Sequence, residues 1–167
     1  MKYVSGPLVI GIDPGLSGAI AFLPLDPTAG LPWVEDMPVI GHSKSGFVKN
    51  AADVVALAKL LEPFGMSGQA AVYLERVNAF PGQGVGSVFS LGMSFWGAAG
   101  VVAACGLPLH LVEPKDWKRH FRLSADKELA RALASRYYPS VNLTRKKDHG
   151  KAEALLIARY GMEKRTK

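Results

Sequence analysis

Strand-type apolar runs and longer runs with helical spacing follow one another in a definite order along this 167-residue chain. The strand-type runs lie at residues 8–13, 18–24, 33–39, 70–77 and 108–112. Helices are predicted at residues 53–61, 87–105, around 117, 124–138 and 148–160, with Pro63, Gly106 and Pro139 as stop signals. Three closely spaced strands favour an antiparallel meander, and strands separated by helices favour parallel addition to the same sheet. The order therefore predicts an α/β fold with a mixed five-stranded sheet and helices on both faces.

The length suits a single domain over residues 1–167, with a core that needs no disulfide or structural metal. Hydrophobic residues make up 49% of the chain and charged residues 20%, which argues against disordered and fibrous classes. The one cysteine, Cys105, lies in an apolar run and is expected to be a buried small hydrophobe. We expect no signal peptide, and no membrane span of about 20 apolar residues, because the nearest stretch, 85–109, indicates a buried helix.

The net charge of +6 is unevenly distributed. Residues 1–114 hold 5 Lys and Arg against 8 Asp and Glu, whereas residues 115–167 hold 15 against 6. The clearest basic cluster is Arg145, Lys146 and Lys147. Such an asymmetry favours a polyanion partner, with nucleic acid as one candidate and a merely solvated loop as the alternative.

Four carboxylates stand at informative places. Asp13 ends the first strand, Glu75 lies near the end of the fourth strand, and Asp148 and Glu153 lie at the start of the last helix. Gathered carboxylates repel one another and suit hard divalent cations, and two Mg²⁺ ions can assist phosphodiester hydrolysis. Each residue also has a structural alternative: a turn residue, an ion pair, a helix cap or a helix-surface residue.

The spacing in the last group leaves the fourth ligand open. Asp148 and Glu153 are five residues apart, which is not one helical face, whereas His149 and Glu153 are four apart. Either Asp148 reaches over from the loop, or His149 belongs to the site. We favour Asp148 as the ligand, with His149 beside it as a ligand or acid/base; an exposed His149 at the helix start is the alternative.

Three motifs resemble the RuvC-type Holliday junction resolvases. They are Gly-Ile-Asp-Pro-Gly at 11–15 followed by Ser-Gly-Ala-Ile-Ala at 17–21, Tyr-Leu-Glu-Arg-Val at 73–77, and Lys-Asp-His-Gly-Lys-Ala-Glu-Ala-Leu-Leu-Ile-Ala at 147–158. The resemblance covers nearly the whole chain, and the phage-encoded branch is the closer match. It implies an RNase H-like fold, a homodimer, and Mg²⁺- or Mn²⁺-dependent paired nicking of four-way DNA junctions, in the cytoplasm of a bacterial or phage-infected cell.

The family's metal-binding carboxylates carry over to Asp13, Glu75 and Glu153, with Asp148 as the fourth. The chain departs from the family in two ways. The usual pattern places the last two acidic residues three apart, and that position here is Gly150. Glu153 also stands where the family more often has Asp.

The resemblance and the charge pattern together predict a DNA-binding set. Its members are Phe80, Lys115, Lys118, Arg119, Arg122, Lys127, Arg145, Lys146 and Lys147. Lys118 and Lys127 resemble active-site lysines of the family, and Lys118 is the expected stabiliser of developing phosphate charge. Phe80 is expected to stack on an unpaired base, with packing on its own domain as the alternative. Trp117 is expected to belong to the core.

The predicted helix 87–105 is apolar nearly all round and rich in Gly and Ala. Such a helix is either a core helix or an interface helix, and we predict contacts with both the sheet and a two-fold partner.

Three other functions are consistent with parts of the sequence. One is another RNase H-fold nuclease acting on branched DNA or RNA–DNA hybrid. Another is a non-catalytic junction-binding module. A third is half of a sugar-kinase- or actin-type ATPase, which would need a second domain.

Overall fold

Five strands form the main sheet in the computed structural model, which describes residues 6–41, 50–65, 68–124 and 126–165. The strands are β1 (Leu8–Asp13), β2 (Ala19–Pro24), β3 (Trp33–Asp36), β6 (Ala70–Glu75) and β7 (Leu109–Val112). Their spatial order is β3-β2-β1-β6-β7. The pairs β1–β2 and β2–β3 are antiparallel, and the pairs β1–β6 and β6–β7 are parallel. The predicted mixed sheet, with a meander followed by parallel strands, is confirmed.

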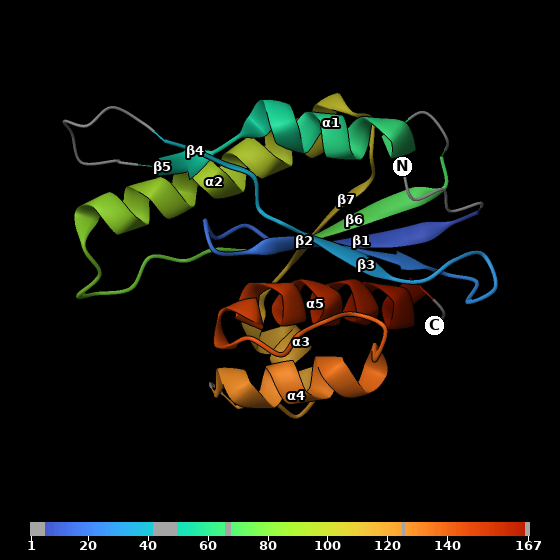
Figure 1. The fold of residues 1–167 in the computed structure, drawn as a ribbon. Coiled ribbons are helices and arrows are strands. Elements are labelled where there is room, and N and C mark those ends of the chain that lie inside the picture. Colours follow the sequence, from blue (N-terminus) through green and yellow to red (C-terminus); the bar gives the residue numbers. More distant parts are fainter. Residues whose placement is uncertain (1–5, 42–49, 66–67, 125, 166–167) are drawn as a thin grey trace.

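Helices cover both faces of the sheet (Figure 1). The helices α1 (Val54–Gly65) and α2 (Val85–Ala104) lie on one face. The other face carries α3 (Pro114–His120), α4 (Lys127–Tyr137) and α5 (His149–Arg165), with a short 3-10 turn, η1 (Lys146–Asp148), before α5. The side chains of β1 point alternately into two hydrophobic cores, one on each face of the sheet. Val9 belongs to the core under α5, whereas Leu8 and Ile10 belong to the core under α2.

The helix α5 packs very closely on β1. A Cβ atom on Gly11 would overlap the backbone of Ala154 and Ala158, so only glycine allows this approach. The first turns of α5 therefore lie near the end of β1 where Asp13 is placed. In this way one glycine in the middle of a strand helps to position the candidate site.

The region after β3 differs from the predicted single strand 33–39. The strand ends at Asp36, and β4 (Val39–Gly41) pairs with β5 (Asn50–Ala52) in a separate two-stranded sheet. The side chain of Met37 is buried, and Pro38 has no N–H to donate to a neighbouring strand. The chain therefore leaves the main sheet at this point.

Two helices run further than the sequence predicted. The helix α1 continues through Pro63 to Gly65, because a proline in the last turn removes only one hydrogen bond near an end that frays. Its start was predicted correctly, since Asp53 Oδ1 accepts hydrogen bonds from the N–H groups of Val55 (3.1 Å) and Ala56 (2.9 Å). The helix α5 reaches Arg165, beyond the predicted end near residue 160.

The helix α2 is long and apolar enough to cross a membrane by length and composition, with a mean hydropathy of 1.5. Its Phe95, Ala98 and Val102 are buried in the core cluster beneath it, whereas 28% of the apolar window as a whole is buried. Cys105, at its C-terminal end, is partly exposed rather than fully buried, because it follows the last turn where the chain leaves the core. The predicted stop at Gly106 is confirmed, with a left-handed φ of 69°.

Candidate active site

Asp13 and Glu75 end neighbouring parallel strands. The register pairs Ile12 of β1 with Leu74 of β6, so the next residues along each strand are the two carboxylates. Parallel strands bring their carboxyl ends to one edge of the sheet, and this edge is where α/β proteins commonly build sites. The sequence-based expectation that Asp13 and Glu75 converge is therefore met by the topology.

The carboxyl group of Asp13 lies in a water-poor, negatively charged environment. Burial and, second, repulsion from Glu153 raise the pKa of Asp13 to about 6. A hydrogen bond from the Gly15 N–H to Asp13 Oδ1 (3.1 Å) and the charges of Lys127 and Lys118 act in the opposite direction. This N–H belongs to the Asp-Pro-Gly turn, so the turn also orients the side chain.

The pKa of Glu75 is also raised, to a higher value than that of Asp13. Burial, followed by repulsion from Asp13, raises the pKa of Glu75 to about 7. The indole N–H of Trp117 donates a 2.7 Å hydrogen bond to Glu75 Oε1 and lowers this pKa, while Glu153 raises it. Asp13, Glu75 and Glu153 therefore act on one another as a single cluster of negative charge, which we call the carboxylate cluster.

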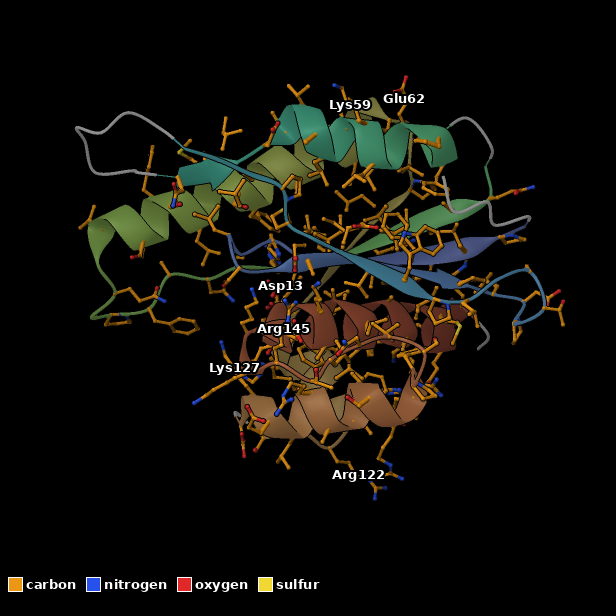
Figure 2. The ribbon with its side chains drawn as sticks, in the orientation of Figure 1. Asp13, Lys59, Glu62, Arg122, Lys127 and Arg145 are labelled. Carbon is orange, nitrogen blue, oxygen red and sulfur yellow. The ribbon has the colours of Figure 1, made fainter. Side chains whose placement is uncertain are left out.

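Two lysines supply positive charge to the carboxylate cluster. Lys118 Nζ of α3 lies 3.9 Å from Glu153 Oε1, and its charge lowers the pKa of both Asp13 and Glu75. Lys127, the first residue of α4, also lowers the pKa of Asp13. In Figure 2, Lys127 projects from its helix on the side of the molecule where Asp13 lies.

Asp148 is held by a neighbouring arginine. Its side chain is buried and accepts hydrogen bonds from the Arg145 N–H (2.9 Å) and from Arg145 Nη2 (2.7 Å). These bonds hold the pKa of Asp148 below its usual range. Asp148 is thus the third residue of η1 and forms a capping box with Arg145, whereas the alternative considered from the sequence was a cap of the last helix.

His149 is neither exposed nor a partner of Glu153 in the structure. Its Nε2 lies 3.3 Å from Glu128 Oε1 of α4, and its buried Nδ1 has no hydrogen-bond partner among the residues that the structure describes. The side chain is only 18% exposed, which argues against the alternative of an exposed helix-start residue. The choice between Asp148 and His149 as a further ligand stays a prediction.

Gly150 lies three residues before Glu153, where the resemblance would place an acidic residue. A Cβ atom there would overlap the carbonyl oxygen of Ser17 and lie 2.8 Å from Gly18 Cα. The β1–β2 turn thus fills the space that a side chain would need, which explains why this chain has no carboxylate at that position.

Replacing Gly150 by Ala is expected to lower the free energy of unfolding by about 1–3 kcal/mol, because the added methyl group overlaps backbone that cannot move aside. Thermal or denaturant unfolding checks this. Gly41→Ala is the matched control, since a Cβ at Gly41 meets no atom of the described residues within 4 Å. Equal stability of the two variants would contradict the tight packing of the turn against α5.

The remaining predicted DNA-binding residues fall into three groups. Lys115, Lys146 and Lys147 are exposed, as is Phe80, whose side chain is 63% exposed in the loop after β6. Arg119 and Arg145 are engaged with Asp116 (2.9 Å) and Asp148. Arg122 points away from the carboxylate cluster, beyond α4 (Figure 2).

Trp117 is the site residue that sequence reasoning missed. It belongs to the core as expected, but its indole N–H also reaches Glu75. The sequence did hold a signal for this contact, because a buried indole N–H requires an acceptor. Trp117 follows β7 closely, and β7 pairs with β6, the strand that ends at Glu75.

The donor set of the carboxylate cluster fits a divalent cation, although its side chains are not drawn together around one in this structure. Oxygen ligands that repel one another fit Mg²⁺ or Mn²⁺. Among the described residues, no group of three or more His, Cys, Asp and Glu side chains is arranged to hold a metal ion as it stands. Lys118 instead supplies the nearest positive charge to Glu153.

Without a divalent cation, the free energy of unfolding is expected to fall as the pH rises from about 4 to about 7. The raised pKa values of Asp13 (about 6) and Glu75 (about 7) mean that the folded chain keeps protons that the unfolded chain has released. Thermal unfolding at a series of pH values measures this, with and without Mg²⁺. Asp13→Asn should flatten the decline, and an identical slope in wild type and variant would contradict the assignment.

Comparison with family models and with curated proteins gives no match. Comparison with solved structures finds Thermus thermophilus RuvC in complex with a Holliday junction substrate, at 16% identity and a TM-score of 0.61, covering 96% of both chains. A second T. thermophilus RuvC structure has 16% identity and a TM-score of 0.56, covering 95% of this chain and 96% of that one. The nearness to a phage-encoded branch stays a prediction. The likeness confirms the RNase H-like fold: this chain has the fold of RuvC over nearly its whole length.

Proposed function

We propose that this chain is a single-domain, metal-dependent endonuclease that resolves four-way DNA junctions by paired phosphodiester hydrolysis. The observation that carries the proposal is the carboxylate cluster: Asp13, Glu75 and Glu153 act on one another at the carboxyl edge of a sheet with the RuvC fold. A DNA substrate would place its activity in the cytoplasm of a bacterial or phage-infected cell.

Asp13, Glu75 and Glu153 would hold divalent cations, Mg²⁺ or Mn²⁺, with two ions as the expected number. When bound, such ions supply activation of water and stabilisation of the oxygens around the reacting phosphorus. The protein's own contribution is to bring the three carboxylates together and to limit water around them, while the charge of Lys118 favours the ionised forms of Asp13 and Glu75. Lys118 and Lys127, which already act on the cluster, would hold the phosphate and stabilise the charge that develops on it.

A further ligand would come from Asp148 or His149. Asp148 would have to exchange its bonds with Arg145 for a cation. His149 has a buried Nδ1 without a hydrogen-bond partner in the described part of the chain, and Glu128 on its other nitrogen would fix the ring. We retain both residues as candidates. Because they are adjacent in the chain, the one that does not bind the cation would lie beside the one that does.

The DNA-binding surface would be formed by basic side chains around the cluster together with Phe80. Lys115, Lys118, Lys127, Lys146 and Lys147 would contact backbone phosphates. Arg119, Arg122 and Arg145 belong to the predicted set, although two of them are paired with carboxylates and Arg122 points elsewhere. The exposed ring of Phe80, in the loop that follows Glu75, would stack on an unpaired base at the crossover.

A homodimer through α2 would match the near two-fold symmetry of a four-way junction. The outer side of α2 exposes Val85 (80%), Phe89 (60%), Met93 (40%) and Trp96 (69%). These residues repeat at helical spacing on the side that does not pack on the sheet. An exposed apolar stripe of this kind supports a protein interface at α2.

The test is cleavage of a labelled synthetic four-way junction at low salt, with Mg²⁺ or with a chelator. Symmetric, metal-dependent cuts in opposed strands are expected, with no cuts in linear duplex. Preferential cleavage of an RNA–DNA hybrid would replace junction resolution by another activity of the same fold. Equal junction binding with metal or chelator, and no cuts in Mg²⁺ or Mn²⁺, would leave a binding module and overturn the proposal.

A further inference from the structure

Trp117 combines complete burial with one specific polar contact. Its side chain is fully buried in the core beneath α5, and its Nε1–H donates to Glu75 Oε1 at 2.7 Å. The two residues are 42 positions apart and come from α3 and β6. This distance lies in the range of hydrogen bonds to ionised carboxylates.

The hydrogen bond from Trp117 opposes the electrostatic repulsion that Glu75 experiences in the carboxylate cluster. Glu75 stands at a strand end beside Asp13 and Glu153, and both repel its ionised form. A flexible glutamate in that field would gain by turning away from its neighbours. An indole N–H on Oε1 compensates part of the repulsion and fixes the side chain, because the ring itself cannot move within the packed core.

The neighbouring residue strengthens the assignment. Lys118 follows Trp117 on α3 and places its ammonium 3.9 Å from Glu153. The short helix therefore contacts Glu75 by one residue and Glu153 by the next. A rigid Trp117 thus fixes the position of α3 against two members of the cluster at once.

We propose that Trp117 is a positioning residue, whose indole N–H holds the Glu75 carboxylate in place to share a divalent cation with Asp13 and Glu153. This inference rests on the proposed metal-dependent function and adds to it a residue outside the ligand set. Partners that orient metal ligands typically change metal affinity about 10- to 100-fold when removed. A purely structural tryptophan would change stability without changing the cation affinity of the folded protein.

The experiment compares Trp117→Phe with Trp33→Phe by calorimetric titration of the full chain with Mg²⁺ or Mn²⁺, at a pH above the raised pKa of Glu75. Trp117→Phe keeps an aromatic ring in the core and removes the N–H. Trp33→Phe is the matched control, since Trp33 is also buried but stacks on Phe22 in the core on the opposite face of the sheet. We expect the Kd to rise about 10- to 100-fold in Trp117→Phe and to be unchanged in Trp33→Phe.

Each other outcome has a distinct meaning. Equal Kd values for folded Trp117→Phe and wild type would overturn the positioning role while leaving the proposed function intact. Failure of wild type to bind either cation, or binding unaffected by Asp13→Asn, would overturn the proposed function and the role of Trp117 with it. In the Glu75→Gln background, Trp117→Phe should have no additional effect, and a full additional loss would show that Trp117 acts elsewhere.

A second measurement leaves Trp117 in place, so it does not depend on whether Trp117→Phe folds. In the variant Trp33→Phe, Trp96→Phe the only indole is that of Trp117. Its fluorescence should change during Mg²⁺ titration, with a midpoint equal to the calorimetric Kd, because the bond to Glu75 is altered when the carboxylate shares a cation. An emission that stays constant while calorimetry shows saturation would overturn the inference.

Discussion

Replacing Asp13 by Asn is expected to reduce junction cleavage by about 1,000-fold or more while the protein still folds and binds junctions. A bound divalent ion contributes several kcal/mol to stabilising the transition state, and each 1.4 kcal/mol is about tenfold in rate. Asn has nearly the same shape and retains an oxygen that accepts the Gly15 N–H, but it carries no charge. Single-turnover cleavage of a labelled junction, beside a gel-shift assay of binding, measures both properties.

Asp26→Asn is the matched control for this substitution. Asp26 also accepts a backbone N–H two residues ahead, from Thr28 (2.8 Å), but it is exposed and takes no part in the carboxylate cluster. Its replacement should leave cleavage unchanged. Cleavage by Asp13→Asn within a few fold of the control would contradict the assignment of Asp13 as a ligand.

Placing charge on the outer side of α2 is expected to separate the proposed homodimer and to abolish paired cutting. Phe89 and Trp96 are 60% and 69% exposed, so a glutamate at either position leaves most of the core of one protomer intact, and at Trp96 it removes an edge contact with Phe95. An aromatic residue at the centre of an interface contributes about 2 kcal/mol or more, which corresponds to at least about a 30-fold rise in the dimer Kd for each substitution. Sedimentation or light scattering gives the oligomeric state.

The functional consequence is a change in the pattern of cuts. Monomers of Phe89→Glu, Trp96→Glu should nick opposed strands independently rather than together, because each active site then acts on its own. Leu31→Glu is the control, since Leu31 is also an exposed apolar residue (70%) but lies outside α2. A double variant that stays dimeric, or a wild type that is monomeric throughout the assay range, would rule out α2 as the interface.

Local sequence patterns were sufficient for the elements of the main sheet and for the places of the carboxylates. Asp-Pro-Gly after an apolar run predicted the end of β1, and a second apolar run predicted β6, although that strand ends at Glu75 rather than at the predicted residue 77. Patterns failed where competing packing decided the outcome. Pro63 lies inside α1, and the segment after Asp36 left the main sheet to form β4 and β5.

The sequence by itself determined the order of strands and helices, and with it the meeting of Asp13 and Glu75, because periodicity and turn residues act over a few positions. Only the tertiary structure decided the partners of the individual polar groups. It placed Arg145 on Asp148, Glu128 beside His149 and Trp117 on Glu75. The reason is physical: burial sets which polar atoms need partners, and Glu75 and Trp117, which are 42 residues apart, meet only when α3 packs on the sheet.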